Sequence, residues 1–440
     1  MKLEKGISYH PYDDKVYIHS VDGRHDYIFE GIVTDVLDFF AAHEDATLEE
    51  LCAKFLAEYD VEEAELKNDM RELVEQLLAE KILYEGTESD PEETWSNKIP
   101  MELEQNFAKQ HKLFSVGIEL TYRCVERCIH CYIDDAPKFC AADELTTNEW
   151  KDILRQVREL GCVRILLTGG EVLLRPDLCE IAEYATSIGL IVNIFTTGIG
   201  LTDEILDRLR ATRVNTVSVS LYSGIASEHD KITGIKGSFD ETLKAVLMLK
   251  AAGIATFIKS VAIKQNFDSL ESLYALGKRF NIYVGIAARM ISGHECKCSS
   301  DYALGNVELY KKFFELKARY VTEDKIDEQF ARERLIDDAS CYAGLCSMSI
   351  DPFGNVRPCL PYPETFGSVR EDSVATLWER TRNFPLKNRF MRNITTHCND
   401  CKYLGQCRVC VADLLNKNNG DPDDCGNILL MAQAAASVAR

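Results

Sequence analysis

The chain has 440 residues, which is too long for one ordinary domain, so two or three domains are expected. Hydrophobic residues make up 46% of it, which excludes a disordered composition. The formal net charge of −21 argues against nucleic-acid and membrane partners, because phosphate contacts require Lys and Arg. No apolar run of about 18 residues and no signal-peptide pattern is present, so we expect a cytoplasmic protein.

Cysteine is frequent and unevenly placed. Of 17 cysteines, three lie within residues 124–131 and eight within residues 341–425. Disulfides are typical of small secreted chains, whereas tight spacings in an intracellular chain more often hold metal. The clustering therefore predicts metal ligation.

Residues 1–95 form the first predicted domain. Short extended segments surround a turn at Asp22-Gly23, and helical periodicity follows over 32–40, 48–59 and 62–82, which indicates a winged-helix-like module. The first 100 residues carry 9 Lys and Arg against 26 Asp and Glu, a net charge of −17 that leaves −4 for the rest. This acidity disfavours the DNA-binding use of the shape. A strand edge beside an acidic helix could instead bind a peptide as an added strand.

Residues 96–112 are predicted to be a linker, and residues 113–330 alternate strand-like and helical patterns. The expected strands are 114–120, 164–167, 191–195, 216–221, 258–262 and 283–287. Such alternation predicts an α/β fold with a parallel sheet whose ligands gather at the carboxyl ends of the strands. Because six units are fewer than a closed barrel needs, we expect a partial (β/α)6 TIM-type barrel. Residues 335–440 are loop-rich and cysteine-rich, so bound clusters are expected to stabilise them.

The first cysteine cluster directly follows the first expected barrel strand. Its pattern C-x3-C-x2-C is formed by Cys124, Cys128 and Cys131. Thiolates select zinc or iron–sulfur clusters. Three ligands on a four-iron cluster would leave one iron open for a substrate or cofactor. A zinc knuckle that lacks one ligand is the alternative.

With this loop the sequence resembles the radical S-adenosylmethionine (SAM) superfamily over residues 113–290. The family motif is C-x3-C-x-aromatic-C, and His130 stands here at the aromatic position. The resemblance implies a [4Fe–4S] cluster on the three cysteines and SAM on its open iron. It also implies SAM contacts from the Gly-Gly-Glu segment after the second strand, from later strand ends and from two side chains near the adenine: Gly169, Gly170, Glu171, Thr197, Ser220, His130 and Tyr132.

One family feature is absent. Relatives often carry a segment like HDxxRG whose Arg pairs with the SAM carboxylate, and here Thr233 occupies that Arg position. Lys231 or Lys259 could supply the positive charge, as a point charge and not as a two-pronged guanidinium.

The second cysteine region resembles the SPASM extension of radical SAM peptide maturases, with one spacing, Cys407-x2-Cys410, a residue shorter than usual. The resemblance implies two auxiliary [4Fe–4S] clusters, hence three clusters in all. The inner cluster would use Cys341, Cys346, Cys359 and Cys410. The outer cluster would use Cys398, Cys401, Cys407 and Cys425. Two four-thiolate zinc sites are the alternative. Cys140 is expected to be a structural thiol, and Cys296 and Cys298 have no assigned role.

The order of the three parts resembles enzymes that mature ribosomally made peptides (RiPPs). The resemblance implies that the front domain binds the leader of a precursor peptide and that a flavodoxin or ferredoxin donates electrons. We expect hydrogen abstraction by a 5′-deoxyadenosyl radical and a thioether bond to a peptide cysteine, as in sactipeptide and ranthipeptide formation. Carbon–carbon or carbon–oxygen crosslinking and sulfatase-maturase-like oxidation are alternatives. An iron–sulfur electron carrier and a winged-helix redox regulator are the non-enzyme alternatives.

Overall fold

The computed structural model describes residues 1–4, 7–12, 14–20, 26–43, 45–85, 101–133, 143–289, 299–320, 342–382, 401–403, 407, 410, 412 and 426–438. The chain divides into two compact units, Met1–Leu103 and Glu104–Arg440. Within the described ranges, no helix combines the length and the apolar character that crossing a bilayer requires.

The N-terminal unit contains a small antiparallel sheet and three helices. Its strands β2 (Ile7–Tyr12), β3 (Lys15–Ser20) and β4 (Asp26–Glu30) pair in that order, while β1 (Lys2–Leu3) pairs with β5 (Leu83–Tyr84). The helices are α1 (Val33–Ala42), α2 (Leu48–Glu58) and α3 (Glu63–Ala79). Helix α2 begins at a capping box between Thr47 and Glu50, which satisfies two otherwise unpaired amides. The unit confirms the winged-helix-like prediction.

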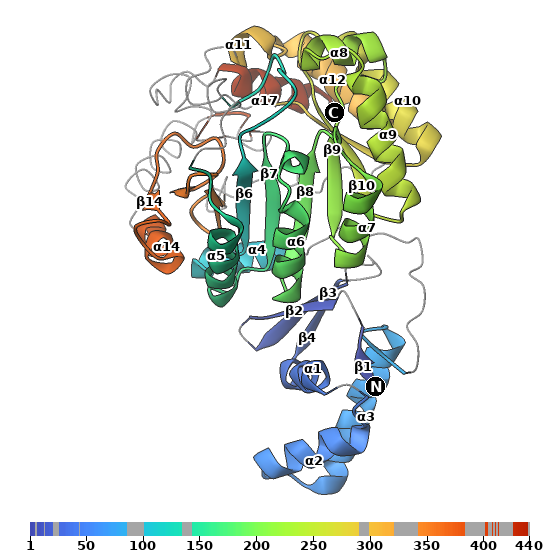
Figure 1. Ribbon diagram of the computed structural model, residues 1–440, viewed down its shortest axis with the longest axis vertical. Coiled ribbons are helices and arrows are strands. Elements are labelled where there is room, and N and C mark those ends of the chain that lie inside the picture. The colour runs from blue at the N-terminus through green and yellow to red at the C-terminus, as the bar shows by residue number, and fades with distance from the viewer. Residues whose placement is uncertain are drawn as a thin grey trace. The chain divides into compact units, whose positions relative to one another are not determined.

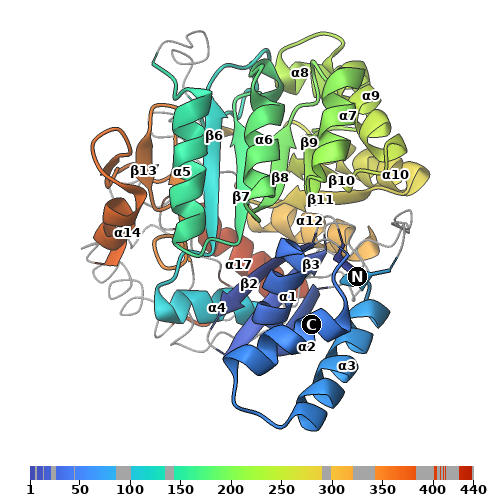
Figure 2. The same cartoon turned by 60° about the horizontal axis from the view of Figure 1, so that its bottom comes forward.

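Strands and helices alternate in the larger unit and build the expected partial barrel (Figure 1). The parallel strands lie in sequence order: β6 (Ser115–Thr121), β7 (Arg164–Gly169), β8 (Ile191–Thr196), β9 (Thr216–Ser220), β10 (Thr256–Val261) and β11 (Tyr283–Ala287). Helices α5 (Thr147–Glu159), α6 (Leu178–Ser187), α7 (Asp203–Thr212), α9 (Ser238–Ala251) and α10 (Leu270–Phe280) cover the outer face of this sheet (Figure 2). Shorter helices join them: η2 (Val172–Leu174), α8 (Ala226–Thr233) and η3 (Phe267–Ser269).

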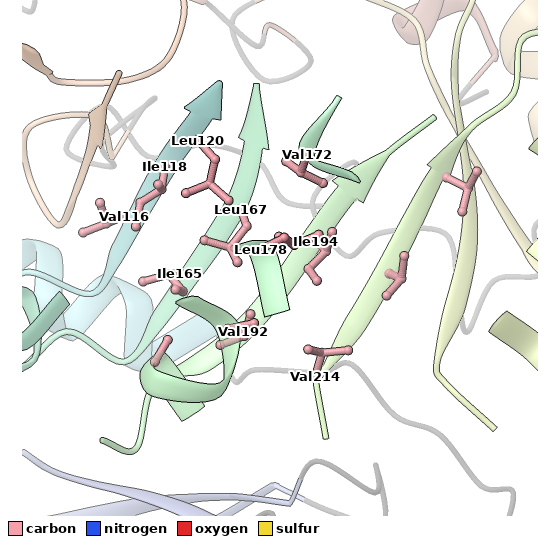
Figure 3. Close-up of a cluster of buried hydrophobic side chains, with 14 of the residues drawn as sticks. Val116, Ile118, Leu120, Ile165, Leu167, Val172, Leu178, Val192, Ile194 and Val214 are labelled. Atoms are coloured by element: carbon pink, nitrogen blue, oxygen red, sulfur yellow. The ribbon is translucent and has the colours of Figure 1, made fainter. Parts of the chain in front are cut away.

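The main hydrophobic core lies between the strands and these helices. Figure 3 shows that alternate residues of neighbouring strands, such as Ile118, Leu167 and Ile194, point to the same side. Because successive side chains of a strand point to opposite faces, the intervening residues, Glu119 and Thr168 among them, face the inside of the barrel. The inner face therefore carries the polar side chains available for chemistry.

The cysteine-rich region continues the same sheet. Strand β12 (Ser347–Ile350) pairs in parallel with β6, and β13 (Asn355–Arg357) and β14 (Gly367–Ser368) follow in antiparallel pairing. Helix α17 (Gly426–Val438) packs against α12 (Val307–Tyr320), and α11 (Ser299–Tyr302) and α14 (Val374–Arg382) complete the described elements.

One segment differs from the sequence-based expectation. Helix α4 (Met101–Gln110) lies within residues 96–112, which we predicted to be a linker. Leu103 and Phe107, four residues apart on one face of the helix, are both buried, and Phe107 packs edge-on against Phe114. The helix therefore buries apolar side chains from a segment that is otherwise largely polar.

We expect the N-terminal unit to unfold separately from the barrel. Leu37 is fully buried in its core, so Leu37→Ala should destabilise this unit by about 2–5 kcal/mol. Calorimetry of the full chain should show one transition moving to lower temperature while the other stays. Val61→Ala, at a position that is 48% exposed, is the control and should change stability by less than about 0.5 kcal/mol. An equal shift of both transitions would contradict independent unfolding.

Candidate functional site

The cysteine loop leaves the carboxyl end of β6 and is fixed by backbone hydrogen bonds. The amides of Arg127 and Ile129 donate to the carbonyls of Thr233 and Ile232 at the end of α8, at 2.8 and 3.0 Å. Within the loop, the amide of Cys131 donates to the carbonyl of Cys128 at 3.1 Å. The loop is thus held at the edge of the barrel where parallel sheets gather their ligands.

The three thiols of this loop are partly buried in acidic surroundings. Burial raises the pKa of Cys124 to about 12, and the charges of Glu126 and Glu171 add to this effect. Burial likewise raises the pKa of Cys128 well above its usual range, and its thiol donates to Glu126 Oε2 at 3.1 Å. A bound cation reverses this preference, because metal coordination deprotonates a thiol. Three soft thiolate donors on one loop therefore match, in their chemistry, the iron–sulfur cluster that the motif implies.

Two glycines let the next loop approach the cysteine loop. The amide of Gly170 donates to the carbonyl of Thr121 at 2.7 Å, and the amide of Glu171 donates to that of Arg123 at 2.7 Å. A Cβ atom on Gly170 would lie 2.2 Å from the Arg123 carbonyl oxygen, and Gly169 has a φ of +128°. No other residue fits this close backbone contact.

Glu171 is a buried residue that accepts hydrogen bonds from several neighbouring segments. Its side chain is fully buried and accepts hydrogen bonds from the Thr196 hydroxyl at 2.5 Å and from the Thr197 amide at 2.6 Å. The Thr197 hydroxyl and the amide of Leu173 also donate to it. Burial raises its pKa, and these hydrogen bonds act in the opposite direction. Glu171 therefore connects the ends of β7 and β8 and positions Thr197.

The two candidate lysines lie in different environments. Lys231 is 71% exposed and pairs with Glu228 at 2.8 Å within α8. Lys259 stands beside Ser220 in the register of β9 and β10, and its ammonium group lies 3.3 Å from the centroid of the Phe195 ring. Neighbouring groups desolvate the ammonium and lower the pKa of Lys259 to about 8, although the residue as a whole is exposed. This geometry favours Lys259 over Lys231 as a cation inside the barrel.

The two side chains expected near an adenine also differ. The His130 ring lies edge-on to Tyr222 at 4.5 Å between centroids, and burial lowers its pKa to about 4, so it is neutral at physiological pH. The Tyr132 hydroxyl donates to Glu119 Oε1 at 2.7 Å. Its hydroxyl is therefore engaged in a buried network.

Sequence reasoning missed two charged residues that support the loop. Glu119 is buried and accepts from both Tyr132 and Tyr122. Arg175 is 7% exposed and donates to the carbonyls of Leu120 and Leu145, at 2.9 and 3.0 Å. In the sequence, the feature that could have indicated them was a charged residue within an apolar strand, for Glu119, or within a turn, for Arg175.

The second cysteine region is described in part. Cys346 is fully buried, and its carbonyl accepts from the amides of Phe114 and Ser115 just before and at the start of β6. Cys359 follows β13 by two residues. Cys401, Cys407 and Cys410 are partly buried. The remaining cysteines named above lie outside the described residues: Cys140, Cys296, Cys298, Cys341, Cys398 and Cys425.

Three family models match consecutive parts of the chain. Residues 27–83 match coenzyme PQQ synthesis protein D (PqqD), residues 118–277 match the radical SAM superfamily, and residues 341–427 match the SPASM iron–sulfur cluster-binding domain.

Curated relatives cover most of the chain. The mycofactocin maturase MftC of Mycobacterium tuberculosis is 32% identical over 66% of this chain and 76% of its own. The antilisterial bacteriocin subtilosin biosynthesis protein AlbA of Bacillus subtilis is 26% identical over 84% of this chain and 82% of its own. An AdoMet-dependent heme synthase of Methanosarcina barkeri is 29% identical over 68% of this chain and 90% of its own.

A solved structure shares the fold over nearly the whole length. Streptococcus suis SuiB bound to the precursor peptide SuiA superposes with a TM-score of 0.60 at 14% identity, covering 95% of this chain and 97% of SuiB. The six-strand partial barrel, the cysteine loop and these matches all point to the same family. The chain belongs to the radical SAM superfamily and is a radical SAM enzyme whose core lies between a PqqD-like domain and a SPASM domain.

Proposed function

We propose that this enzyme modifies a ribosomally synthesised precursor peptide and forms thioether crosslinks to its cysteines. The PqqD-like domain carries the argument, because the heme synthase among the relatives means that a similar core serves other substrates. AlbA is named for biosynthesis of a bacteriocin and MftC as a maturase, and SuiB was solved with a precursor peptide. These names favour a peptide substrate for this chain.

The PqqD-like domain offers a strand edge for a leader peptide. The family match begins at residue 27, in β4, which is an end strand of the described three-stranded sheet. The Tyr27 hydroxyl donates to the Glu80 carboxylate at 2.8 Å, so β4 lies beside the end of α3. Ile28 is 40% exposed on this strand. In the part of the chain that the structure describes, β4 is an end strand beside a helix, and such an edge suits an extended peptide added as a further strand.

We assign the cofactor sites residue by residue. Cys124, Cys128 and Cys131 would hold the cluster that leaves one iron open. SAM would lie against the backbone of Gly169 and Gly170, near Thr197 and His130, with its carboxylate at Ser220 and Lys259. Glu171 and Tyr132 would support this site through their internal hydrogen bonds, and Lys231 would lie outside it. The SPASM cysteines would hold two auxiliary clusters, divided as the resemblance implies.

The proposed reaction is a net oxidation of the peptide in which atoms and electrons balance. When bound, the loop cluster and SAM supply a 5′-deoxyadenosyl radical, and the auxiliary clusters supply an acceptor for the electron released later. A peptide C–H bond would break as its hydrogen passes to that radical, which would become 5′-deoxyadenosine. The carbon would then bond to a cysteine sulfur, whose thiol would lose a proton while one electron passes to an auxiliary cluster. A flavodoxin or ferredoxin would supply the electron that cleaves SAM.

Mass spectrometry of a co-expressed candidate peptide tests the proposal. The probe is a short cysteine-containing precursor encoded beside this gene. We expect the peptide to lose two hydrogens per linkage, and its modified cysteines to resist alkylation. Carbon–carbon or carbon–oxygen crosslinks would give the same mass change with free cysteines. An unchanged peptide mass alongside active SAM cleavage would refute crosslinking.

Gly170 should be essential for the close contact between the two loops. Gly170→Ala places a Cβ atom against two backbone carbonyls of the cysteine loop, which side-chain rotation cannot relieve. We expect the reconstituted variant to lose its SAM-dependent electron paramagnetic resonance (EPR) change and to make no 5′-deoxyadenosine. Gly117→Ala in β6 is the control, because its Cβ would meet its nearest neighbour at 3.4 Å. Normal SAM cleavage by Gly170→Ala would contradict the assigned site.

SAM affinity should depend on the charge of Lys259. With a pKa of about 8, the free ammonium group is charged below that pH and loses its proton above it. Binding of the SAM carboxylate should therefore weaken as pH rises through about 8, measured by equilibrium dialysis on reconstituted enzyme. Lys259→Arg should remove this pH dependence, because a guanidinium stays charged. Lys259→Met should weaken binding about tenfold or more at lower pH.

Lys231→Met is the matched comparison and should leave SAM affinity unchanged. If instead Lys231→Met weakened binding and Lys259→Met did not, the carboxylate contact would belong to α8.

A further inference from the structure

A single buried carboxylate holds both ends of the cysteine loop. Glu119 lies on the inner face of β6 and is 1% exposed. Its Oε1 accepts from the Tyr132 hydroxyl at 2.7 Å and its Oε2 from the Tyr122 hydroxyl at 2.9 Å. Tyr122 precedes Cys124 by two residues, and Tyr132 directly follows Cys131. One side chain therefore ties together the residues that flank the first and last thiols of the loop.

The same network reaches the β12–β13 hairpin inside the second cysteine region. The Tyr122 ring packs edge-on against Phe353, in the turn between β12 and β13, at 5.7 Å between centroids. Asp351 in this turn is 3% exposed and pairs with Arg357 at 2.8 Å. The chain continues from Arg357 to Cys359 in two residues. A contiguous set of side chains, with Glu119 and Asp351 buried and the aromatic rings between them half-buried, thus joins the cysteine loop to the hairpin.

The pKa of Glu119 supports the connection between the cysteine loop and the hairpin. Burial raises the pKa of Glu119 to about 7, and the two tyrosine hydrogen bonds oppose that shift. The charge of Asp351 raises the same pKa further, and the charge of Arg357 lowers it, so the groups are near enough to interact. A buried carboxyl is costly unless hydrogen-bonded, and a partly satisfied network is worse than an apolar one. Each carboxylate oxygen of Glu119 accepts one phenol hydrogen bond, so the buried carboxyl itself is satisfied.

We propose that Glu119 is a positioning residue for the loop cluster: its carboxylate fixes the two ends of the cysteine loop relative to each other, and Tyr122 transmits that constraint to the β12–β13 turn beside Cys359. Substituting residues that orient metal ligands typically costs about 10- to 100-fold in metal affinity or activity. The inference rests on membership of the radical SAM superfamily and is independent of the peptide substrate.

Glu119→Leu and Glu119→Gln in the full-length chain test the proposal without peptide. The readouts are iron release to a chelator and the SAM-induced change in the EPR spectrum of the reduced protein, which reports the cluster with the open iron. We expect Glu119→Leu to release iron from that cluster about 10- to 100-fold faster and to lose the SAM-induced change. Glu119→Gln should be milder, because the amide oxygen still accepts one phenol hydrogen bond.

Tyr132→Phe removes one hydroxyl and keeps the ring, so it decides the matter if Glu119→Leu does not fold. Its matched control is Tyr320→Phe, which removes an exposed hydroxyl that donates to Glu271 at 2.8 Å. We expect Tyr132→Phe, but not Tyr320→Phe, to accelerate iron release and to alter the SAM-induced EPR change. Wild-type behaviour of both Tyr132→Phe and Glu119→Gln would overturn the role of Glu119.

Phe353→Leu tests the connection to the hairpin. This substitution is remote in sequence from the cysteine loop but loosens the ring contact with Tyr122. An altered SAM-induced EPR change in Phe353→Leu supports transmission through Tyr122. If the EPR change is unaltered in Phe353→Leu while Glu119→Gln alters it, the network stops at the cysteine loop, and that part of the proposal is wrong.

Discussion

The close contact between two loops is the constraint on which the rest of the site depends. The backbone from Thr121 to Arg123 lies directly against Gly169 and Gly170, with no room for a Cβ atom at Gly170. Because each loop follows a neighbouring parallel strand, the pairing of β6 with β7 brings them together. Glu171, next in the chain, then connects this contact to the end of β8 through Thr196 and Thr197.

The two faces of the barrel sheet carry different kinds of side chain. The helix-covered face is apolar and holds the fold, as Ile118, Leu167 and Ile194 show. The inner face presents Glu119, Ser220 and Lys259, of which only Glu119 is buried and held by internal hydrogen bonds, while Ser220 and Lys259 remain open to a ligand. Strand periodicity assigns each side chain to a face, and register then decides which side chains become neighbours.

Much of this could be predicted from the sequence, for a physical reason. The cysteine loop and Gly169-Gly170-Glu171 are contiguous motifs, and the six barrel strands are short apolar runs bounded by turn residues. The features that sequence-based prediction missed depend on contacts between residues that are distant in the sequence or that only the fold brings together. Helix α4 was missed because most of its residues are polar. Lys231 and Lys259 were equivalent in sequence, and the structure separates them, because the register of β10 with β9 places Lys259 beside Ser220. Glu119 gave no motif, because its two tyrosine partners lie on either side of a loop.

The parallel pairing of β12 with β6 has a consequence for how such an enzyme can be divided. The first barrel strand is not an edge: hydrogen bonds from β7 and from β12 cover both its sides. Cutting the chain before β12, or exchanging that end with one from a relative of different register, would leave a row of bare amides and carbonyls along β6, a surface prone to aggregation. The SPASM part is therefore not a detachable module, and chimeras of these enzymes need a junction beyond β14.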